Sequence, residues 1–123
     1  MANITELSDK TFNDETNKGL VITDFNADWC PPCKMMNPIL EKLSSTDELG
    51  DKIKFTSMNV DHNPDTPNNF GIQGIPTFII KKDGNVVGRM VGYQPEEKFR
   101  LELEKYMERT ESVVRAPSLR GFA

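Results

Sequence analysis

The sequence lacks long apolar runs and clusters of basic residues. No apolar stretch among its 123 residues approaches the length that a membrane-spanning helix needs. The formal net charge is −4, from 15 basic and 19 acidic side chains, and no basic patch offers a surface for phosphates. We therefore expect neither a membrane nor a nucleic acid as a partner.

Histidine and cysteine are also scarce, which argues against a metal site. A structural zinc site usually has four ligands, whereas this chain has two cysteines, Cys30 and Cys33, and one histidine, His62. A purely structural disulfide is a second alternative, but so short a loop would stabilise the fold by only about 2 kcal/mol. The first ten residues have neither the basic nor the apolar region of a secretory signal, so we expect a cytoplasmic location. Paired cysteines in that reducing compartment are usually catalytic or metal-binding.

The placement of the two cysteines favours redox chemistry. Residues 20–25 are mostly apolar or β-branched and predict a strand, and the cysteines follow it as Cys30-Pro31-Pro32-Cys33. Apolar residues then recur at helical spacing, at Met35, Met36, Ile39, Leu40 and Leu43. The N-terminus of a helix carries free N–H groups and partial positive charge, which favour a thiolate. We therefore expect Cys30 to act as the nucleophile and Cys33 as the resolving thiol.

The remaining pattern predicts a single α/β domain over residues 1–109. It indicates a weak strand over 3–7 and then a short helix, capped by Ser8 or Asp9, that runs to about Asn17. A helix after the cysteines runs to about Leu49 with Pro38 inside it, followed by a strand over 52–60 and a loop with one helical turn over 61–69. Two strands over 75–81 and 85–91 are joined at Asp83-Gly84, and Pro95, Glu96 and Glu97 open a last helix. This order predicts a mixed sheet with helices on both faces. Periodicity fades after Thr110, so residues 110–123 are predicted to form a flexible C-terminal tail, with a docking arm as the alternative.

The motif WCPPCK at residues 29–34, after a strand that carries Asp24, and GIPT at residues 74–77 resemble thioredoxin over about residues 1–108. The resemblance implies the thioredoxin fold, a central mixed five-stranded sheet flanked by helices on both faces. It implies a monomeric protein-disulfide reductase with no bound cofactor and a redox-active Cys30–Cys33 disulfide. Its partners would be disulfide-containing proteins and an NADPH-dependent flavoprotein thioredoxin reductase. Its roles would be electron transport and cell redox homeostasis.

The resemblance also implies roles for residues around the cysteines. It makes Asp24 a buried acid with a raised pKa that moves the proton of Cys33, whereas the pattern alone allows a solvent-exposed position at a strand end. It implies a cis peptide bond before Pro76. The active-site turn would include Trp29, Pro31 and Pro32, and an apolar substrate-binding rim would include Val60, Gly74, Ile75, Pro76, Val91 and Gly92, with Tyr93 as a local addition.

The sequence departs from the thioredoxin pattern at three positions near the site. Pro31 stands where most thioredoxins have glycine, Asn26 stands in place of an aromatic residue, and Ser57 stands in place of a lysine. Without that lysine, Asp24 loses a cationic partner.

Two alternative functions remain open from the sequence. The WCPPC motif also occurs in tryparedoxins, nucleoredoxins and membrane-tethered reductases of cytochrome maturation, so the protein could be a dedicated reductant for one partner. The tethered proteins carry a membrane anchor and an insertion, and neither is found in this sequence. The second alternative is a non-catalytic binding subunit that uses the apolar rim.

Overall fold

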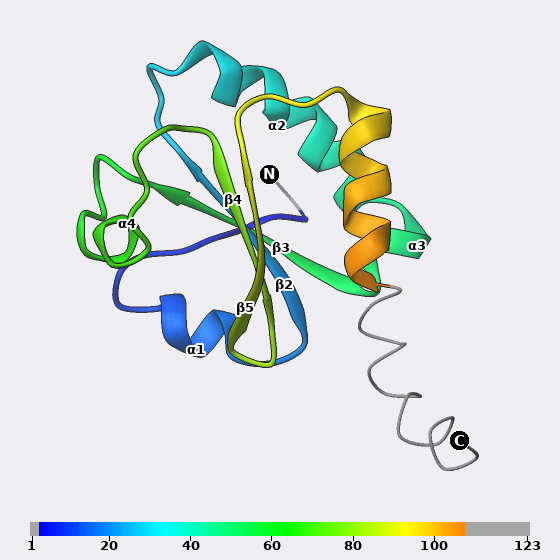
Figure 1. The fold of residues 1–123 in the computed structure, drawn as a ribbon, viewed down its shortest axis with the longest axis horizontal. Coiled ribbons are helices and arrows are strands. Elements are labelled where there is room, and N and C mark those ends of the chain that lie inside the picture. Colours follow the sequence, from blue (N-terminus) through cyan, green and yellow to red (C-terminus); the bar gives the residue numbers. More distant parts are fainter. Residues whose placement is uncertain (1–2, 108–123) are drawn as a thin grey trace, which may run out of the picture.

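A five-stranded mixed sheet forms the centre of the computed structural model, which describes residues 3–107 (Figure 1). The strands lie in the order β1 (Thr5–Glu6), β3 (Ile53–Asn59), β2 (Leu20–Asn26), β4 (Thr77–Lys82) and β5 (Asn85–Val91). β3 pairs in parallel with β1 and β2, and β4 runs antiparallel to β2 and β5. The predicted mixed sheet of five strands is therefore confirmed.

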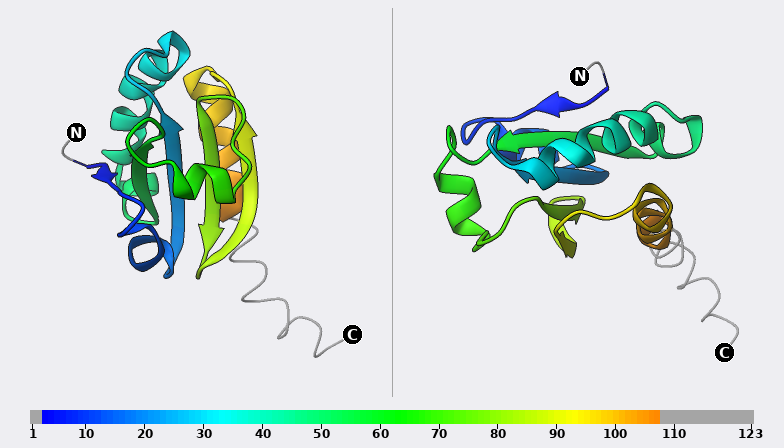
Figure 2. Two further views of the ribbon diagram at one scale, coloured as in Figure 1. Left: turned by 90° about the vertical axis from the view of Figure 1, so that its left-hand side faces the viewer. Right: turned by 90° about the horizontal axis from the view of Figure 1, so that it is seen from above.

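Helices cover both faces of this sheet. The helices are α1 (Phe12–Thr16), α2 (Pro31–Ser44), α3 (Asp47–Gly50) and α4 (Asp65–Asn69), followed by a helix over residues 96–107. Figure 2 shows α4 and the helix of residues 96–107 on opposite sides of the strands. No helix in the described range, 3–107, is long and apolar enough to cross a membrane. The predicted domain end at residue 109 and the predicted tail lie outside that range.

The side-chain alternation of β2 divides the core and determines where Asp24 lies. Ile22 packs with Met36 and Leu40 of α2, whereas Phe25 belongs to the core cluster on the opposite face, with Phe12 of α1. Successive side chains of a strand point to opposite faces. Asp24 therefore lies on the same face as Ile22, which is the face that α2 covers.

The predicted helix from the cysteines to Leu49 is divided in two by a hydroxyl-rich segment. α2 ends at Ser44, and a separate helix, α3, begins at Asp47. The Thr46 hydroxyl accepts the Leu49 N–H and donates to the Leu43 carbonyl, so it caps the second helix while it ends the first. The predicted continuous helix was wrong because these local hydrogen bonds compete with the helical ones.

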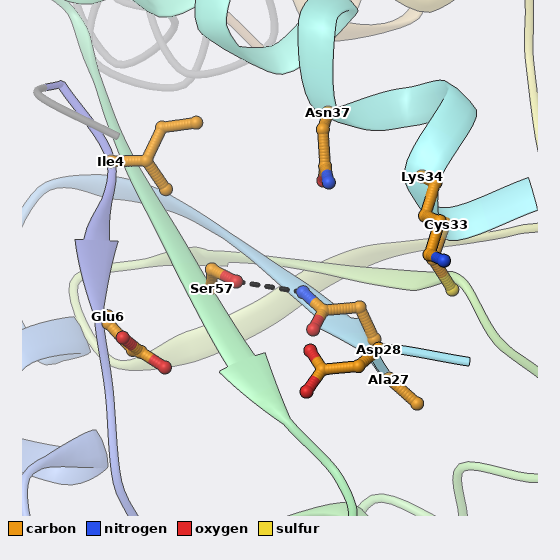
Figure 3. A pocket seen from close by; sticks show the side chains of 9 residues that line it. Ile4, Glu6, Ala27, Asp28, Cys33, Lys34, Asn37 and Ser57 are labelled. Carbon is orange, nitrogen blue, oxygen red and sulfur yellow. Dashed lines mark hydrogen bonds between the residues drawn. The ribbon is translucent and has the colours of Figure 1, made fainter. Parts of the chain in front are cut away.

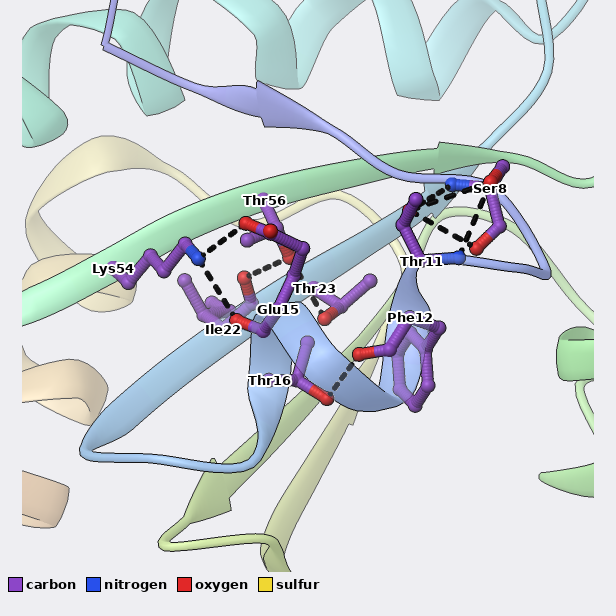
Figure 4. Close-up of polar contacts among 9 residues, drawn as sticks. All are labelled: Ser8, Thr11, Phe12, Glu15, Thr16, Ile22, Thr23, Lys54 and Thr56. Atoms are coloured by element: carbon purple, nitrogen blue, oxygen red, sulfur yellow. Dashed lines mark hydrogen bonds and ion pairs between the residues drawn. The ribbon is translucent and has the colours of Figure 1, made fainter.

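The first helix is shorter than predicted, because Asp9 has another partner. Its carboxylate accepts the backbone N–H groups of Asp65 and Thr66 at the start of α4, at 3.1 and 2.8 Å. Ser8 and Thr11 form a hydrogen-bonded turn, and α1 begins only at Phe12 (Figure 4). The prediction that Ser8 or Asp9 caps this helix was therefore wrong, because the N-cap residue is Thr11.

The β4–β5 hairpin turns where the sequence predicts it. Asp83 and Gly84 both have positive φ, +49° and +87°, as a two-residue hairpin turn requires. The Asp83 carboxylate also accepts the Gly19 N–H at 2.7 Å, which joins the hairpin to the start of β2. The hydrogen bond from Gly19 lowers the pKa of Asp83.

Candidate active site

Cys30 and Cys33 form a disulfide at the N-terminus of α2. Cys30 is the N-cap residue, with extended backbone, and its Sγ accepts the Cys33 N–H at 3.3 Å. Pro31 and Pro32 occupy the first two helical positions and have no N–H to offer. The Lys34 N–H donates to the Cys30 carbonyl. The Cys33 N–H is thus the backbone donor that the helix start gives to the Cys30 sulfur.

Both cysteines are buried in the disulfide form. Cys30 is 3% exposed and Cys33 is 2% exposed, so burial does not distinguish the two sulfurs. They cluster with Ala27, and the half-buried side chains of Val60 and Ile75 pack against them. The Cys30 Sγ also lies 3.7 Å from the Ile75 carbonyl oxygen. The two sulfurs differ instead in their hydrogen bonds, because the Cys30 Sγ accepts the Cys33 N–H.

Asp24 is a buried carboxylate on the face of β2 that α2 covers. The residue is 1% exposed, its Oδ2 accepts a hydrogen bond from Asn26, and its Oδ1 has no hydrogen-bond partner among the described residues. Burial raises the pKa of Asp24 to about 7, and the hydrogen bond from Asn26 limits that rise. The predicted burial and the predicted direction of the pKa shift both agree with the structure.

Asn26 and Ser57 are connected to Asp24, although the sequence presented them only as departures from the family pattern. The Asn26 Nδ2 donates to the Asp24 Oδ2 at 3.1 Å and to the Ser57 Oγ at 2.8 Å. Ser57 pairs with Asp24 in the register of β2 and β3. The i, i+2 spacing of Asp24 and Asn26 is the sequence signal that places them on one strand face. No pattern in the sequence indicates that Ser57 lies opposite Asp24, because that depends on the register between β2 and β3.

A cavity of about 430 Å³ lies between β1, the end of β2, β3 and the start of α2 (Figure 3). It is lined by Ile4, Glu6, Asn26, Ala27, Asp28, Cys33, Lys34, Asn37 and Ser57. In Figure 3 a dashed line marks the hydrogen bond to Ser57, and Cys33 lies at the other side of the cavity. Cys33 and Asn26 thus line the same cavity, and Asn26 is hydrogen-bonded to Asp24.

The predicted substrate-binding rim divides into buried support and exposed apolar surface. Trp29 is 66% exposed and Val91 is 61% exposed, and exposed apolar side chains of this size suit contact with another protein. Pro76 is buried and its preceding peptide bond is cis, in agreement with the expectation from the resemblance. Tyr93 is also exposed, at 42%.

Several contacts bring parts of this rim together. The Gly92 N–H donates to the Pro76 carbonyl at 2.8 Å, and a Cβ placed on Gly74 would lie 3.9 Å from the Val91 side chain. The Trp29 indole donates to the Asp61 carboxylate at 2.8 Å. Val60 and Ile75 pack against the cysteines, and these contacts place the other predicted rim residues near the disulfide as well.

The residues with metal-binding side chains do not converge. Across the described part of the chain, no three side chains from histidine, cysteine, aspartate and glutamate form a group that could hold a metal ion. His62 donates its backbone N–H to Asn59, whose amide in turn donates to Asp28. The geometry of the site therefore rests on the two sulfurs, the buried carboxylate and the apolar surface around them.

Comparisons with known proteins agree with this arrangement. The family model for thioredoxin matches residues 3–105. The thioredoxin of Listeria monocytogenes is 47% identical over 104 residues, which cover 85% of this chain and 99% of that protein. The thioredoxin of Bacillus subtilis is 41% identical over 104 residues, which cover 85% of this chain and 98% of that protein. The crystal structure of Malassezia sympodialis thioredoxin matches with a TM-score of 0.74 at 32% identity, over 83% of this chain and 89% of that chain.

Proteins of this family are protein-disulfide oxidoreductases that use no bound cofactor, and the Cys30–Cys33 pair is the redox-active disulfide in this chain. The fold, the position of the disulfide and these matches have one consequence: the chain belongs to the thioredoxin family and is a thiol–disulfide oxidoreductase.

Proposed function

We propose that the protein reduces disulfides of protein substrates by dithiol exchange, with Cys30 as the attacking thiolate. The observation that carries this assignment is the hydrogen bond from the Cys33 N–H to the Cys30 Sγ at the helix start, because it stabilises negative charge on that sulfur. The thiolate attacks one sulfur of the substrate disulfide. A mixed disulfide forms, and the other substrate sulfur leaves as a thiolate that takes a proton from solvent.

Cys33 completes the reaction by attacking the Cys30 sulfur of the mixed disulfide. The attack forms the Cys30–Cys33 disulfide and releases the second substrate sulfur, so two electrons pass from the protein to the substrate. Cys33 must first lose its proton, and Asp24 is the acceptor that we assign. A carboxylate with a pKa of about 7 is suited to accept and return protons at neutral pH.

The substrate is held by the apolar rim around the disulfide. Trp29, Val60, Gly74, Ile75, Pro76, Val91 and Gly92 supply this surface. An extended substrate segment pairs with the backbone at Ile75, in the manner of strand addition. The Ile75 carbonyl lies 3.7 Å from the Cys30 Sγ, so a segment paired there has its disulfide close to the nucleophile.

The oxidised protein then needs a source of two electrons. We assign this role to an NADPH-dependent flavoprotein thioredoxin reductase in the cytoplasm, so that the protein carries electrons from NADPH to protein disulfides and contributes to cell redox homeostasis. The family membership supports this assignment, and the protein is expected to work as a monomer.

Reduction of insulin disulfides, with NADPH and a thioredoxin reductase, tests this function. The wild-type protein is expected to support NADPH oxidation, and Cys30→Ser is expected to abolish it. Cys33→Ser is expected to accumulate the mixed disulfide with substrate, which mass spectrometry detects. Full activity of Cys30→Ser would contradict the proposed mechanism. A wild-type protein that leaves insulin disulfides intact even in its dithiol form would favour a binding subunit, and one that no thioredoxin reductase reduces would favour a dedicated reductant.

A further inference from the structure

Within residues 3–107, the buried Asp24 carboxylate has no cationic partner, and one residue supplies its side-chain hydrogen bond. The Asn26 Nδ2 donates to Oδ2, and Oδ1 has no hydrogen-bond partner within residues 3–107. Desolvation is the main cause of the raised pKa of Asp24, and the Asn26 hydrogen bond is the opposing cause. The state of this acid therefore depends on a neutral amide rather than on a nearby charge.

Three charged side chains line the cavity beside Asn26. They are Glu6 of β1, Asp28 after β2, and Lys34 of α2. In the described part of the chain, none of these three has a hydrogen bond or an ion pair with Asp24. On β3 the opposite residue is Ser57, and on β4 it is Phe78, neither of which carries a charge.

We propose that Asn26 is a positioning residue for Asp24: its amide holds one carboxylate oxygen, and the other oxygen, which has no hydrogen-bond partner within residues 3–107, is left to take up a proton. The proposal rests on the role of Asp24 as the proton acceptor of Cys33. The proton leaves the Cys33 Sγ and arrives on the Asp24 carboxylate, and it later returns to solvent. An amide cannot take up this proton itself, so Asn26 acts only through Asp24.

Ser57 competes with Asp24 for the Asn26 amide. An amide NH₂ has two hydrogens, whereas this one is shared by three acceptors: the Asp24 Oδ2, the Asp24 carbonyl and the Ser57 Oγ, at 3.1, 3.1 and 2.8 Å. Loss of the amide removes the donor that favours the ionised carboxylate. Loss of the Ser57 hydroxyl leaves more of that donor for Asp24. The two changes are therefore expected to move the pKa of Asp24 in opposite directions.

The test is an NMR titration of the Asp24 side-chain carboxyl carbon in the oxidised protein. Asn26→Leu, which removes the amide at similar size, is expected to raise the Asp24 pKa by about one pH unit, from about 7. Ser57→Ala is expected to lower it. Asn37→Leu is the matched control, because Asn37 lines the same cavity and has no hydrogen bond to Asp24. It is expected to leave the pKa where it is in the wild-type protein.

The kinetic readout is single-turnover reduction of a substrate disulfide between pH 5 and pH 9. With the Asp24 pKa raised by one pH unit, Asn26→Leu is expected to resolve the mixed disulfide about fivefold more slowly at pH 7 and at nearly the wild-type rate at pH 9. Alkylation of reduced Cys30 in the same variant is expected to keep its wild-type rate. Asn26→Gln, which retains an amide, is expected to lie between Asn26→Leu and the wild-type protein.

An unchanged or lowered Asp24 pKa in Asn26→Leu would overturn the proposal, as would an equal rise in Asn37→Leu. Ser57→Ala decides it if Asn26→Leu does not fold, because a raised Asp24 pKa in Ser57→Ala contradicts the shared amide. The role of Asp24 fails separately: if Asp24→Asn resolves the mixed disulfide at the wild-type rate, Asp24 is not the proton acceptor. In that case the positioning of Asp24 by Asn26 has no part in the reaction, whatever the titrations show.

Discussion

Replacement of Asp24 by asparagine is expected to stabilise the protein at pH 8 and to bring little gain at pH 5. Asp24 is 1% exposed, and its pKa in the folded protein is about 7 against an ordinary value of 3.8. The folded state therefore binds this proton more tightly than the unfolded state does. The contribution of Asp24 to the free energy of unfolding is therefore highest below pH 3.8. It falls as the pH rises from 3.8 to about 7 and stays low at higher pH.

The size of the effect follows from the two pKa values. Relative to a neutral side chain in its place, Asp24 lowers the free energy of unfolding by about 4 kcal/mol at pH 8 and by about 1.5 kcal/mol at pH 5, where the cost arises because the carboxyl ionises only in the unfolded state. Asparagine avoids this penalty, but its N–H groups replace an Oδ1 that has no partner in the described structure, at a cost of about 1–3 kcal/mol. The net gain is therefore about 1–3 kcal/mol at pH 8, and it is near zero or negative at pH 5.

Urea unfolding of the oxidised wild-type and Asp24→Asn proteins from pH 4 to pH 9 measures this difference. The cost of the asparagine does not depend on pH, so the change between pH 5 and pH 8, about 2.5–3 kcal/mol, is the part that tests the burial of the charge. Asp14→Asn, at an exposed position of α1, is the control for loss of one negative charge. Parallel curves for the wild-type and Asp24→Asn proteins would refute the assignment of Asp24 as a desolvated acid.

Three further predictions concern the cysteines, a helix cap and the core. Iodoacetamide is expected to modify reduced Cys30 before Cys33 at pH 7, since the helix start stabilises the Cys30 thiolate, and peptide mapping over time would show equal rates if that is incorrect. Thr46→Ala is expected to lower the free energy of unfolding by about 1 kcal/mol, because the side chain caps α3; an unchanged urea midpoint would contradict it. Phe99→Ala is expected to cost about 3–5 kcal/mol, since the ring is fully buried with its centroid 4.8 Å from that of Phe78; a loss below about 1 kcal/mol in urea unfolding would show that the site collapses around the smaller residue.

Much of the fold could be predicted because local signals and global structure agree. The strand over 20–25, the hairpin at Asp83-Gly84 and the helix start after Cys30 each have residues whose backbone preferences match the observed conformation. The two errors have one physical origin. Asp9 and Thr46 both have side chains suited to a helix N-cap, but which helix each one caps depends on contacts that a local pattern does not contain.

In the site, too, features that depend on local sequence could be predicted, and features that depend on tertiary contacts could not. The position of the cysteines at a helix start is local, so the nucleophile could be proposed from the sequence. The environment of Asp24 is not local, because it depends on the register that places Ser57 opposite Asp24 and on the amide of Asn26, which reaches both. In the sequence, Asn26 and Ser57 were notable only because they stand where the family pattern has an aromatic residue and a lysine. In the structure they are a hydrogen-bonded pair beside a cavity, and the buried acid has a neutral donor where a lysine would have supplied a charge. Burial raises the pKa of Asp24 to about 7, and a neutral donor such as the Asn26 amide opposes that rise less than a cation beside the carboxylate would.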